Sequence, residues 1–254
     1  MKAFIICCAA IVNGVIFCAQ PAQTPSSPAT IRVDAAFDAI VSPGTTMETL
    51  KDGFGFINGI VWVKESSGGH LLISDIPANV VYRWTSDGKM SSFLEKPDWT
   101  ATPGRPAAPR FGANGITLDP QGRIVYAAEA DRAIVRLEKD GKRTILADRY
   151  EGKRLNSPND LVYRSDGALF FTDPPFGLPR FHDDPRRETP SFGVYALLKG
   201  KLKLVATEFR GPTGIAFSPD EKYLYVGNWD ETNKVVKRFE VRPDGSLANG
   251  TVFH

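Results

Sequence analysis

The fold of this chain is decided by residues 113–147, which read ANGITLDPQGRIVYAAEADRAIVRLEKDGKRTILA. The apolar residues of this stretch fall into four short runs, at 115–118, 124–128, 133–137 and 144–147. Runs of this length, rich in branched side chains, are typical of β-strands. Asp119–Gly122 places Pro at the second position of a turn, and Asp140-Gly141 is a strong hairpin signal. The stretch therefore predicts four consecutive antiparallel strands.

Three other stretches begin in the same way, with a small polar residue followed by an apolar strand. They are FINGIVWV at 56–63, SPNDLVYRSDGALFFTD at 157–173 and GPTGIAFSPDEKYLYVGN at 211–228. The small polar residues of the four stretches are Asn58, Asn114, Asn159 and Thr213, with spacings of 45 to 56 residues. Repeats of this length with several strands each indicate a propeller.

Asp-Gly pairs support the repeat. They occur at Asp87-Gly88, Asp140-Gly141, Asp166-Gly167 and Asp244-Gly245. One such pair would mean little, but four of them in register with the repeat indicate repeated antiparallel sheets. We therefore predict an all-β fold, a β-propeller with about four blades within residues 31–254. The one helix expected after the N-terminal segments is short, near 35–40.

Composition excludes several classes of protein. The 254 residues include 31 Lys plus Arg and 29 Asp plus Glu, so the net charge is +2. This balance, without a clustered basic stripe, argues against a nucleic-acid partner. The three histidines are far apart in sequence, which argues against a His-rich zinc site. No Gly-x-Ser-x-Gly motif is present, so a Ser-His-Asp hydrolase of that type has no anchor.

The first thirty residues differ from the rest. Residues 1–20 carry a positive charge at Lys2, followed by an apolar run with the length of a signal-peptide core. Residues 21–30 form a Pro/Ser/Gln linker. We expect an export signal and a periplasmic or secreted product with no membrane association after cleavage, an uncleaved anchor being the alternative. All three cysteines lie in residues 1–20, so the cleaved product would have no disulfide.

The repeat brings together residues that can carry chemistry. In a propeller the first strand of each blade lines the central channel, so Asn58, Asn114, Asn159 and Thr213 should face one another. A ring of neutral oxygen ligands with some carboxylates suits a hard cation such as Ca²⁺. The alternative is that each Asn only caps a turn through its own backbone.

From about residue 54 onward, the chain resembles the gluconolactonase, senescence-marker-protein and regucalcin-like family. The most specific stretches are LLISDIPANVVYRW (71–84), ANGITLDPQGR (113–123), RYEGKRLNSPNDLVYRSDGALFFTDPPFGL (149–178) and GIAFSPDEKYLYV (214–226). The resemblance implies a six-bladed propeller, one divalent cation in the channel, usually calcium, and hydrolysis of sugar-acid lactones such as gluconolactone.

The resemblance also implies a set of cation ligands, and this chain departs from it. The family's Pro-Asn-Asp motif is complete at 158–160 and supplies Asn159. Asn58 stands where the family has a Glu, and Thr213 stands where it has a second Asn. The family's later Asp motif is absent from the sequence, which stops at His254 in mid-blade. The predicted metal ligands are therefore Asn58, Asn159 and Thr213.

The predicted catalytic residues are the remaining carboxylates near these motifs, Asp160 and Asp173. The predicted substrate-binding residues, which would orient the sugar hydroxyls, are Asn114, Asn159 and Asp160. The leading function is lactone hydrolysis with a channel cation; the alternative is a catalytically silent propeller that binds a sugar acid or a partner protein. Because the family has six blades, we expect the propeller to be incomplete at its C-terminus, with residues 31–50 helping to close the ring.

Overall fold

The computed structural model describes residues 31–97 and 112–254. The predicted export signal and linker lie outside the described residues. The chain divides into two compact units, Met1–Leu50 and Lys51–His254. The described part of the first unit contains the short helix expected near residues 35–40, a 3₁₀ helix η1 (Ala35–Ala39) capped by the side chain of Asp34. The ring-closing role of residues 31–50 stays a prediction.

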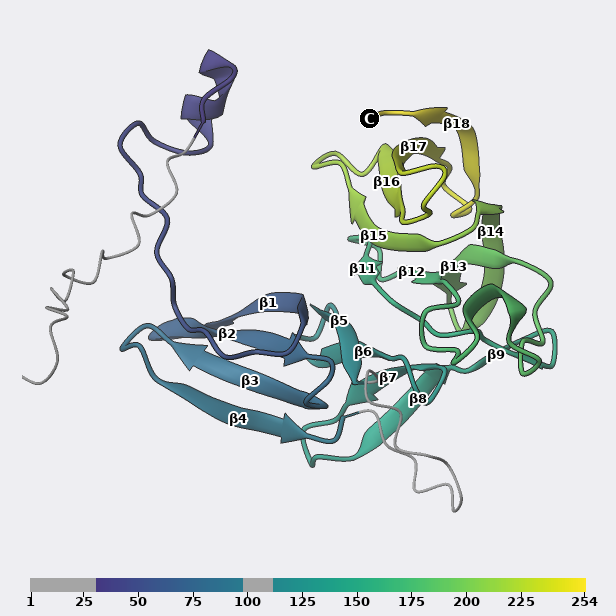
Figure 1. The fold of residues 1–254 in the computed structure, drawn as a ribbon, viewed down its shortest axis with the longest axis horizontal. Helices are drawn as coiled ribbons and strands as arrows, with labels where there is room; N and C mark the ends of the chain where they lie inside the picture. Colours follow the sequence, from purple (N-terminus) through teal and green to yellow (C-terminus); the bar gives the residue numbers. More distant parts are fainter. Residues whose placement is uncertain (1–30, 98–111) are drawn as a thin grey trace, which may run out of the picture. The chain divides into compact units, whose positions relative to one another are not determined.

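The second unit is built from four-stranded antiparallel sheets, in which each strand pairs with the next one in sequence (Figure 1). Blade 1 comprises β1 (Ile57–Glu65), β2 (Gly68–Asp75), β3 (Val80–Thr85) and β4 (Met90–Glu95), and blade 2 comprises β5 (Ala113–Leu118), β6 (Ile124–Ala128), β7 (Ala133–Leu137) and β8 (Arg143–Ala147). Blade 3 comprises β11 (Leu161–Tyr163), β12 (Leu169–Asp173), β13 (Phe192–Leu198) and β14 (Lys201–Phe209), and blade 4 comprises β15 (Pro212–Phe217), β16 (Tyr223–Asn228), β17 (Val235–Val241) and β18 (Leu247–Val252).

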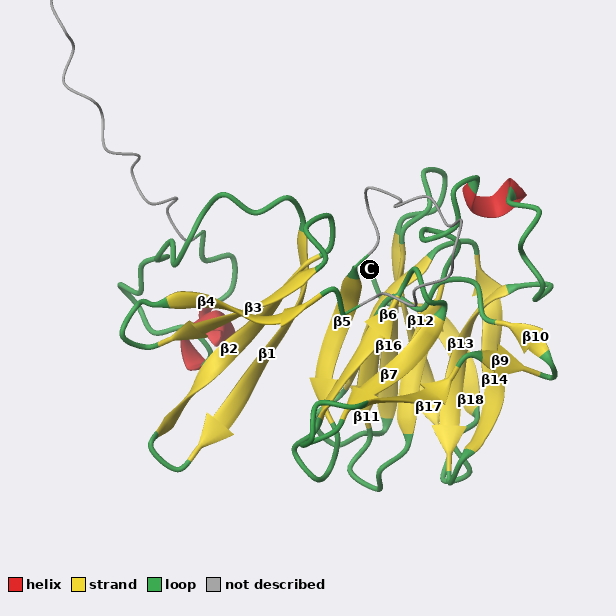
Figure 2. Cartoon of the chain, turned by 90° about the horizontal axis from the view of Figure 1, so that it is seen from below, coloured by secondary structure: helices red, strands yellow, loops and turns green. Residues whose placement is uncertain are grey.

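The remaining elements are small. A two-stranded sheet, β9 (Arg149–Tyr150) with β10 (Lys153–Arg154), follows blade 2, and a 3₁₀ turn η2 (Phe181–Asp183) lies between β12 and β13. Figure 2 shows how strands dominate the second unit. The prediction of an all-β propeller with four blades is confirmed. None of the helices in the described residues has the length and apolar character that crossing a membrane requires.

The Asp-Gly pairs form turns for a common physical reason. The glycine takes the left-handed conformation, with φ of 82° at Gly88 and 87° at Gly167, where other residues are strained. In each pair the aspartate carboxylate accepts from the backbone N–H two residues on. The expectation that all four share one phase is wrong for Asp166, which joins the first and second strands of its blade instead of the third and fourth.

Side-chain alternation along each strand packs adjacent blades together. In β12, Phe170 belongs to the apolar cluster between blades 3 and 4, whereas its neighbour Phe171 belongs to the cluster between blades 2 and 3. Both rings are fully buried. Successive strand residues point to opposite faces, so one strand serves two interfaces. A third cluster, around Leu72 and Tyr126, joins blades 1 and 2.

Two blade faces stay exposed within the described part of the second unit. In β1, Val61 and Val63 pack toward blade 2, while Ile60 and Trp62 on the opposite face are 57% and 45% exposed. In blade 4, Phe253 stacks edge-on against Tyr225 and remains exposed. Blades 1 and 4 thus each bury one face against a described neighbour, whereas blades 2 and 3 bury both.

Candidate functional site

The starts of the inner strands are tied to one another between blades 1 and 2. The hydroxyl of Ser74, the next-to-last residue of β2, accepts from the N–H of Gly59 at 2.8 Å and donates to the carbonyl of Asn114 at 2.7 Å. One buried hydroxyl therefore bridges the first strands of both blades. It holds the residues that follow Asn58 against Asn114.

The first strands of the other neighbouring blades are also joined by hydrogen bonds, but through different groups. Between blades 2 and 3, the N–H of Gly115 donates directly to the carbonyl of Asn159 at 2.7 Å. Between blades 3 and 4, the hydroxyl of Thr172 accepts from the N–H of Asp160 at 3.1 Å and donates to the carbonyl of Thr213 at 2.8 Å. The four predicted ring residues thus lie at one level, at the starts of adjacent inner strands.

Glycine after the ring residue permits this close approach. A Cβ on Gly59 would lie 2.2 Å from the carbonyl oxygen of Asn114, and one on Gly115 would lie 2.5 Å from a carboxylate oxygen of Asp160. No side chain fits at such distances. The Asn-Gly pattern seen in the sequence therefore reflects packing between blades.

An amide relay connects ring residues to a carboxylate that sequence reasoning missed. The side-chain amide of Asn58 donates to the amide oxygen of Asn114, and the amide of Asn114 donates to the carboxylate of Glu129 at 3.1 Å. Asn58 is exposed, whereas Asn114 and Glu129 are only 2% and 3% exposed. The relay therefore runs from solvent into the protein. Glu129 follows β6 directly, and its only signal in the sequence is a charge after an apolar strand.

The other two predicted ligands differ in their surroundings. Asn159 is buried, and its backbone N–H donates to the carbonyl of Thr172 at 2.9 Å. Within residues 31–97 and 112–254, its side-chain amide has no hydrogen-bonded partner. Thr213 is half-buried, with its hydroxyl 3.5 Å from the carbonyl of Gly227. The side chains of Asn159 and Thr213 thus keep bonding capacity for a ligand.

Asp160, predicted for catalysis and substrate binding, joins blades 3 and 4. One carboxylate oxygen accepts from the N–H of Leu161 at 2.9 Å and the other from the N–H of Ile215, in β15, at 3.0 Å. Burial raises the pKa of Asp160, and the two backbone donors oppose that rise. Both oxygens are therefore engaged in holding strands, which favours a structural role over that of a base. Its catalytic role stays a prediction.

Asp173, the other predicted catalytic residue, is fully buried at the end of β12. Its carboxylate accepts from the N–H groups of Asn156 and Ser157, both at 2.8 Å, and from the side-chain amide of Asn156 at 3.0 Å. Burial raises the pKa of Asp173 to about 7, against these donors and the charge of Arg132. Its bonds hold the loop before β11, and none of them reaches a ring residue.

Two other blades use the same position in the same way. Asp75, at the end of β2, accepts from the N–H groups of Gly55 and Phe56. Asn228, at the end of β16, accepts from the N–H of Gly211. The acceptor at the end of the second strand therefore fixes the segment that leads into the first strand. Asp173 belongs to this structural pattern.

The ring can offer neutral oxygen atoms to a hard cation. The described residues contain no group of three His, Cys, Asp or Glu side chains arranged to hold a metal ion. The oxygens of Asn58, Asn159 and Thr213 are nevertheless of the kind that calcium accepts. The residues fit such an ion in chemical type, with attraction weaker than a carboxylate would provide.

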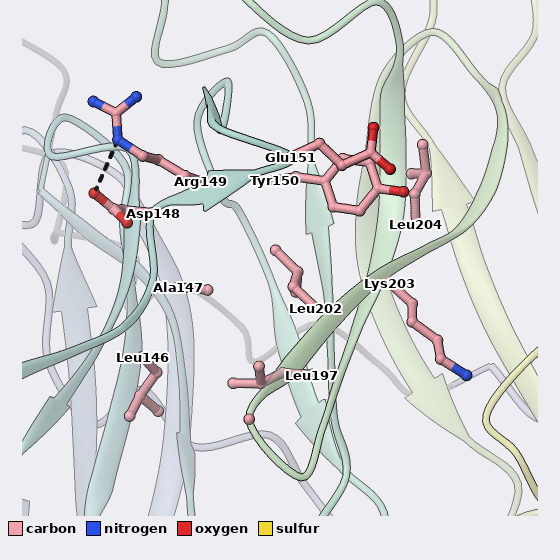
Figure 3. Close-up of a pocket in the computed structure, with 11 residues that line it drawn as sticks. Leu146, Ala147, Asp148, Arg149, Tyr150, Glu151, Leu197, Leu202, Lys203 and Leu204 are labelled. Carbon is pink, nitrogen blue, oxygen red and sulfur yellow. Dashed lines mark ion pairs between the residues drawn. The ribbon is translucent and has the colours of Figure 1, made fainter.

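A separate hollow of about 590 Å³ lies away from the ring, between the outer parts of blades 2 and 3. Figure 3 shows leucine side chains, among them Leu197 and Leu202, with the Arg149–Asp148 ion pair to one side and Lys203 to the other. None of the predicted site residues lines it.

Comparisons with known proteins agree with this fold. The chain is 37% identical over 220 residues to a gluconolactonase of Zymomonas mobilis, covering 85% of this chain and 60% of that protein. A solved gluconolactonase of Xanthomonas campestris superposes with a TM-score of 0.68 at 35% identity, covering 81% of this chain and 64% of that one. The chain thus spans less than two thirds of the length of these relatives.

A more distant structure shares the fold alone. The calcium-binding protein regucalcin of Agrobacterium tumefaciens superposes with a TM-score of 0.56 at 18% identity, covering 80% of this chain and 61% of that one. The sequence model for the SMP-30/gluconolactonase/LRE-like region matches residues 56–254, which is all of the described propeller. On this match, and on the identity with the Zymomonas protein, the chain belongs to the SMP-30/gluconolactonase/LRE-like family.

Proposed function

We propose that this protein hydrolyses the lactone of a sugar acid, with the substrate bound at the ring formed by Asn58, Asn114, Asn159 and Thr213. The observation that carries the proposal is the 37% identity to a gluconolactonase, together with the hydrogen bonds that hold the four ring residues at the starts of adjacent strands. A sugar lactone carries several hydroxyl groups, and amide side chains both donate to and accept from hydroxyls.

The chain's own residues would bind and orient the substrate. Asn58 and Asn159 offer amide oxygens that accept from sugar hydroxyls, and the hydroxyl of Thr213 can donate or accept. Asn114 is held in place by the relay to Glu129 and so supports Asn58. Fixed polar groups of this kind lower the cost of orienting a flexible ligand.

A divalent cation, calcium in our proposal, would be held by the oxygens of Asn58, Asn159 and Thr213. When bound, it would polarise the lactone carbonyl and favour attack by water. Asn159 is the central ligand of the three because it is buried and its side chain is not committed to another described residue.

One observation favours a second candidate, a catalytically silent propeller that binds a sugar acid. Both predicted catalytic carboxylates, Asp160 and Asp173, are occupied by backbone N–H groups. These bonds commit both carboxylates to holding the backbone, so the ring is left without a carboxylate that is free of a structural role. Such a protein would bind the open-chain acid or the lactone without turning it over.

Proton release during incubation with gluconolactone separates the two candidates. Lactone hydrolysis produces an acid, so a pH-stat measures it directly above the spontaneous rate. We expect an enzymatic rate that falls on addition of EDTA and returns with Ca²⁺. A saturable heat of gluconate binding without any rate above background would instead establish the silent propeller.

We also propose that the protein is exported through residues 1–20, as the sequence indicates. Expression with the native N-terminus should give a periplasmic or secreted product whose mass corresponds to a start between residues 19 and 30. A cytoplasmic product that retains Met1 would contradict this proposal.

A further inference from the structure

We propose that Glu129 is a positioning residue, which sets the direction of hydrogen bonding through Asn114 so that Asn58 presents its amide oxygen to a ligand. Asn58, Asn114 and Glu129 form a relay of two hydrogen bonds. Once one end of such a relay is fixed, the NH₂ group and the oxygen of each amide can face only one way.

The carboxylate fixes that end. An ionised carboxylate only accepts hydrogen bonds, so the group of Asn114 that faces Glu129 must be its NH₂. The amide oxygen of Asn114 then faces the other way and must accept. Asn58 therefore turns its own NH₂ toward Asn114. Its oxygen takes no part in the relay, and no described residue donates to it.

Burial makes the direction costly to reverse. Glu129 and Asn114 lie almost entirely out of solvent, so water cannot compensate for a mismatched pair. The loop after β12 packs over the carboxylate, since a Cβ on Gly177 would lie 2.5 Å from Cγ of Glu129. Asn58 lies at the exposed end of the relay, so its amide oxygen is the group that a ligand can reach.

As a consequence, Asn58 should select ligand groups that bind to an oxygen atom. The oxygen of Asn58 suits a divalent cation, and this part of the inference rests on the proposed function. Glu129 contributes indirectly, since its charge is two side chains away from the exposed end of the relay. A neutral residue at position 129 would accept either orientation of Asn114 and so would leave the direction unset.

An isosteric exchange tests the direction without any ligand. Asn58→Asp places acceptors at both ends of Asn114, so one contact becomes repulsive; we expect Tm to fall by about 2–6 °C for a domain of this size. Glu129→Gln can still accept from Asn114, and its own change in Tm is measured beside that of Asn58→Asp. The double variant Asn58→Asp/Glu129→Gln reverses every bond of the relay at unchanged net charge. It should recover at least half of the loss caused by Asn58→Asp.

A matched pair on the surface is the control. The amide of Asn249 donates to the carboxylate of Glu240 at 2.8 Å, and both residues are exposed. The exchange Asn249→Asp/Glu240→Gln should give additive changes near zero because water satisfies each group. Additive changes at positions 58 and 129, with the double variant as unstable as the sum of the single variants, would overturn the relay.

Calorimetric titration with Ca²⁺ then measures the ligand part. In the reversed relay, the carboxylate introduced at position 58 has one oxygen bonded to Asn114 and a second for the cation, so the double variant should bind at least about tenfold more tightly than the parent. Non-additive changes in Tm at positions 58 and 129, without calcium binding by any variant, would support the relay and would reject the cation in the proposed function. Calcium binding by Glu129→Gln that equals that of the parent would reject the positioning role of Glu129.

Discussion

The pH dependence of stability should reveal the buried carboxylate of Asp173. Its pKa in the folded protein is raised to about 7 from a reference value of 3.8, because burial disfavours the charged form. The folded state therefore keeps a proton that the unfolded chain has lost between pH 4 and pH 7. Stability from this group is fully present below about pH 4 and is lost as the pH rises through about 7.

The expected size follows from the shift. A difference of about three pKa units corresponds to about 4 kcal/mol, which is an upper limit for the loss of unfolding free energy over this range. Asp173→Asn cannot titrate but leaves one of the bonds to Asn156 or Ser157 without an acceptor, at a cost of about 1–3 kcal/mol. The variant should be less stable than the parent at pH 4 and as stable or more stable at pH 8.

Urea denaturation followed by tryptophan fluorescence at each pH from 4 to 8 measures this crossover. Asp75→Asn is the matched variant, since Asp75 makes the equivalent pair of backbone bonds in blade 1. It gives the cost of losing one acceptor at each pH. A free-energy difference between Asp173→Asn and the parent that stays constant, or that turns further against the variant as the pH rises, would refute the reasoning.

Three further predictions concern the ring and the links between blades. Gly59→Ala should lower the unfolding free energy, measured by urea denaturation, by about 3 kcal/mol or more, because the new Cβ would meet the carbonyl of Asn114. Gly214→Ala, whose nearest contact is at 3.9 Å, should lower it by less than about 1 kcal/mol. Equal losses would contradict the packing argument. Thr172→Val keeps the shape and removes the hydroxyl between blades 3 and 4, so it should lower the unfolding free energy by about 1–3 kcal/mol. Asn159→Ala should abolish any rise in Tm caused by millimolar Ca²⁺ without changing the metal-free Tm by more than a few degrees, and a retained calcium effect would remove Asn159 from the ligand set.

The strands and turns were predictable because the relevant signals are local. The runs at 115–118, 124–128, 133–137 and 144–147 lie within the observed strands of blade 2. The Asp-Gly turns depend on φ > 0 at one residue and on one carboxylate bond, both encoded in a dipeptide. The phase of Asp166-Gly167 was misjudged because such a pair can join any two adjacent strands of a blade.

The site was predictable only in part because its bonds join distant residues. The repeat phase brought Asn58 and Asn114 together correctly, since equivalent residues of a repeat occupy equivalent places. Glu129 was missed because nothing in its own segment indicates that Asn114 will reach it. The engagement of Asp160 by the N–H of Ile215, 55 residues away, likewise appears only when blades pack.

The links at the starts of the inner strands have a consequence for how the propeller opens. Within the described residues, each blade is bonded at this level only to its neighbours, through Ser74, Gly115 and Thr172 in turn. Stability of such an array is a sum over blades and adjacent interfaces. Among the described blades, detaching blade 1 or blade 4 breaks one interface, whereas detaching blade 2 or blade 3 breaks two. Amide hydrogens of β6 and β12 should therefore exchange with solvent most slowly, and those of β3 and β17 should exchange first, as the array unzips from both sides.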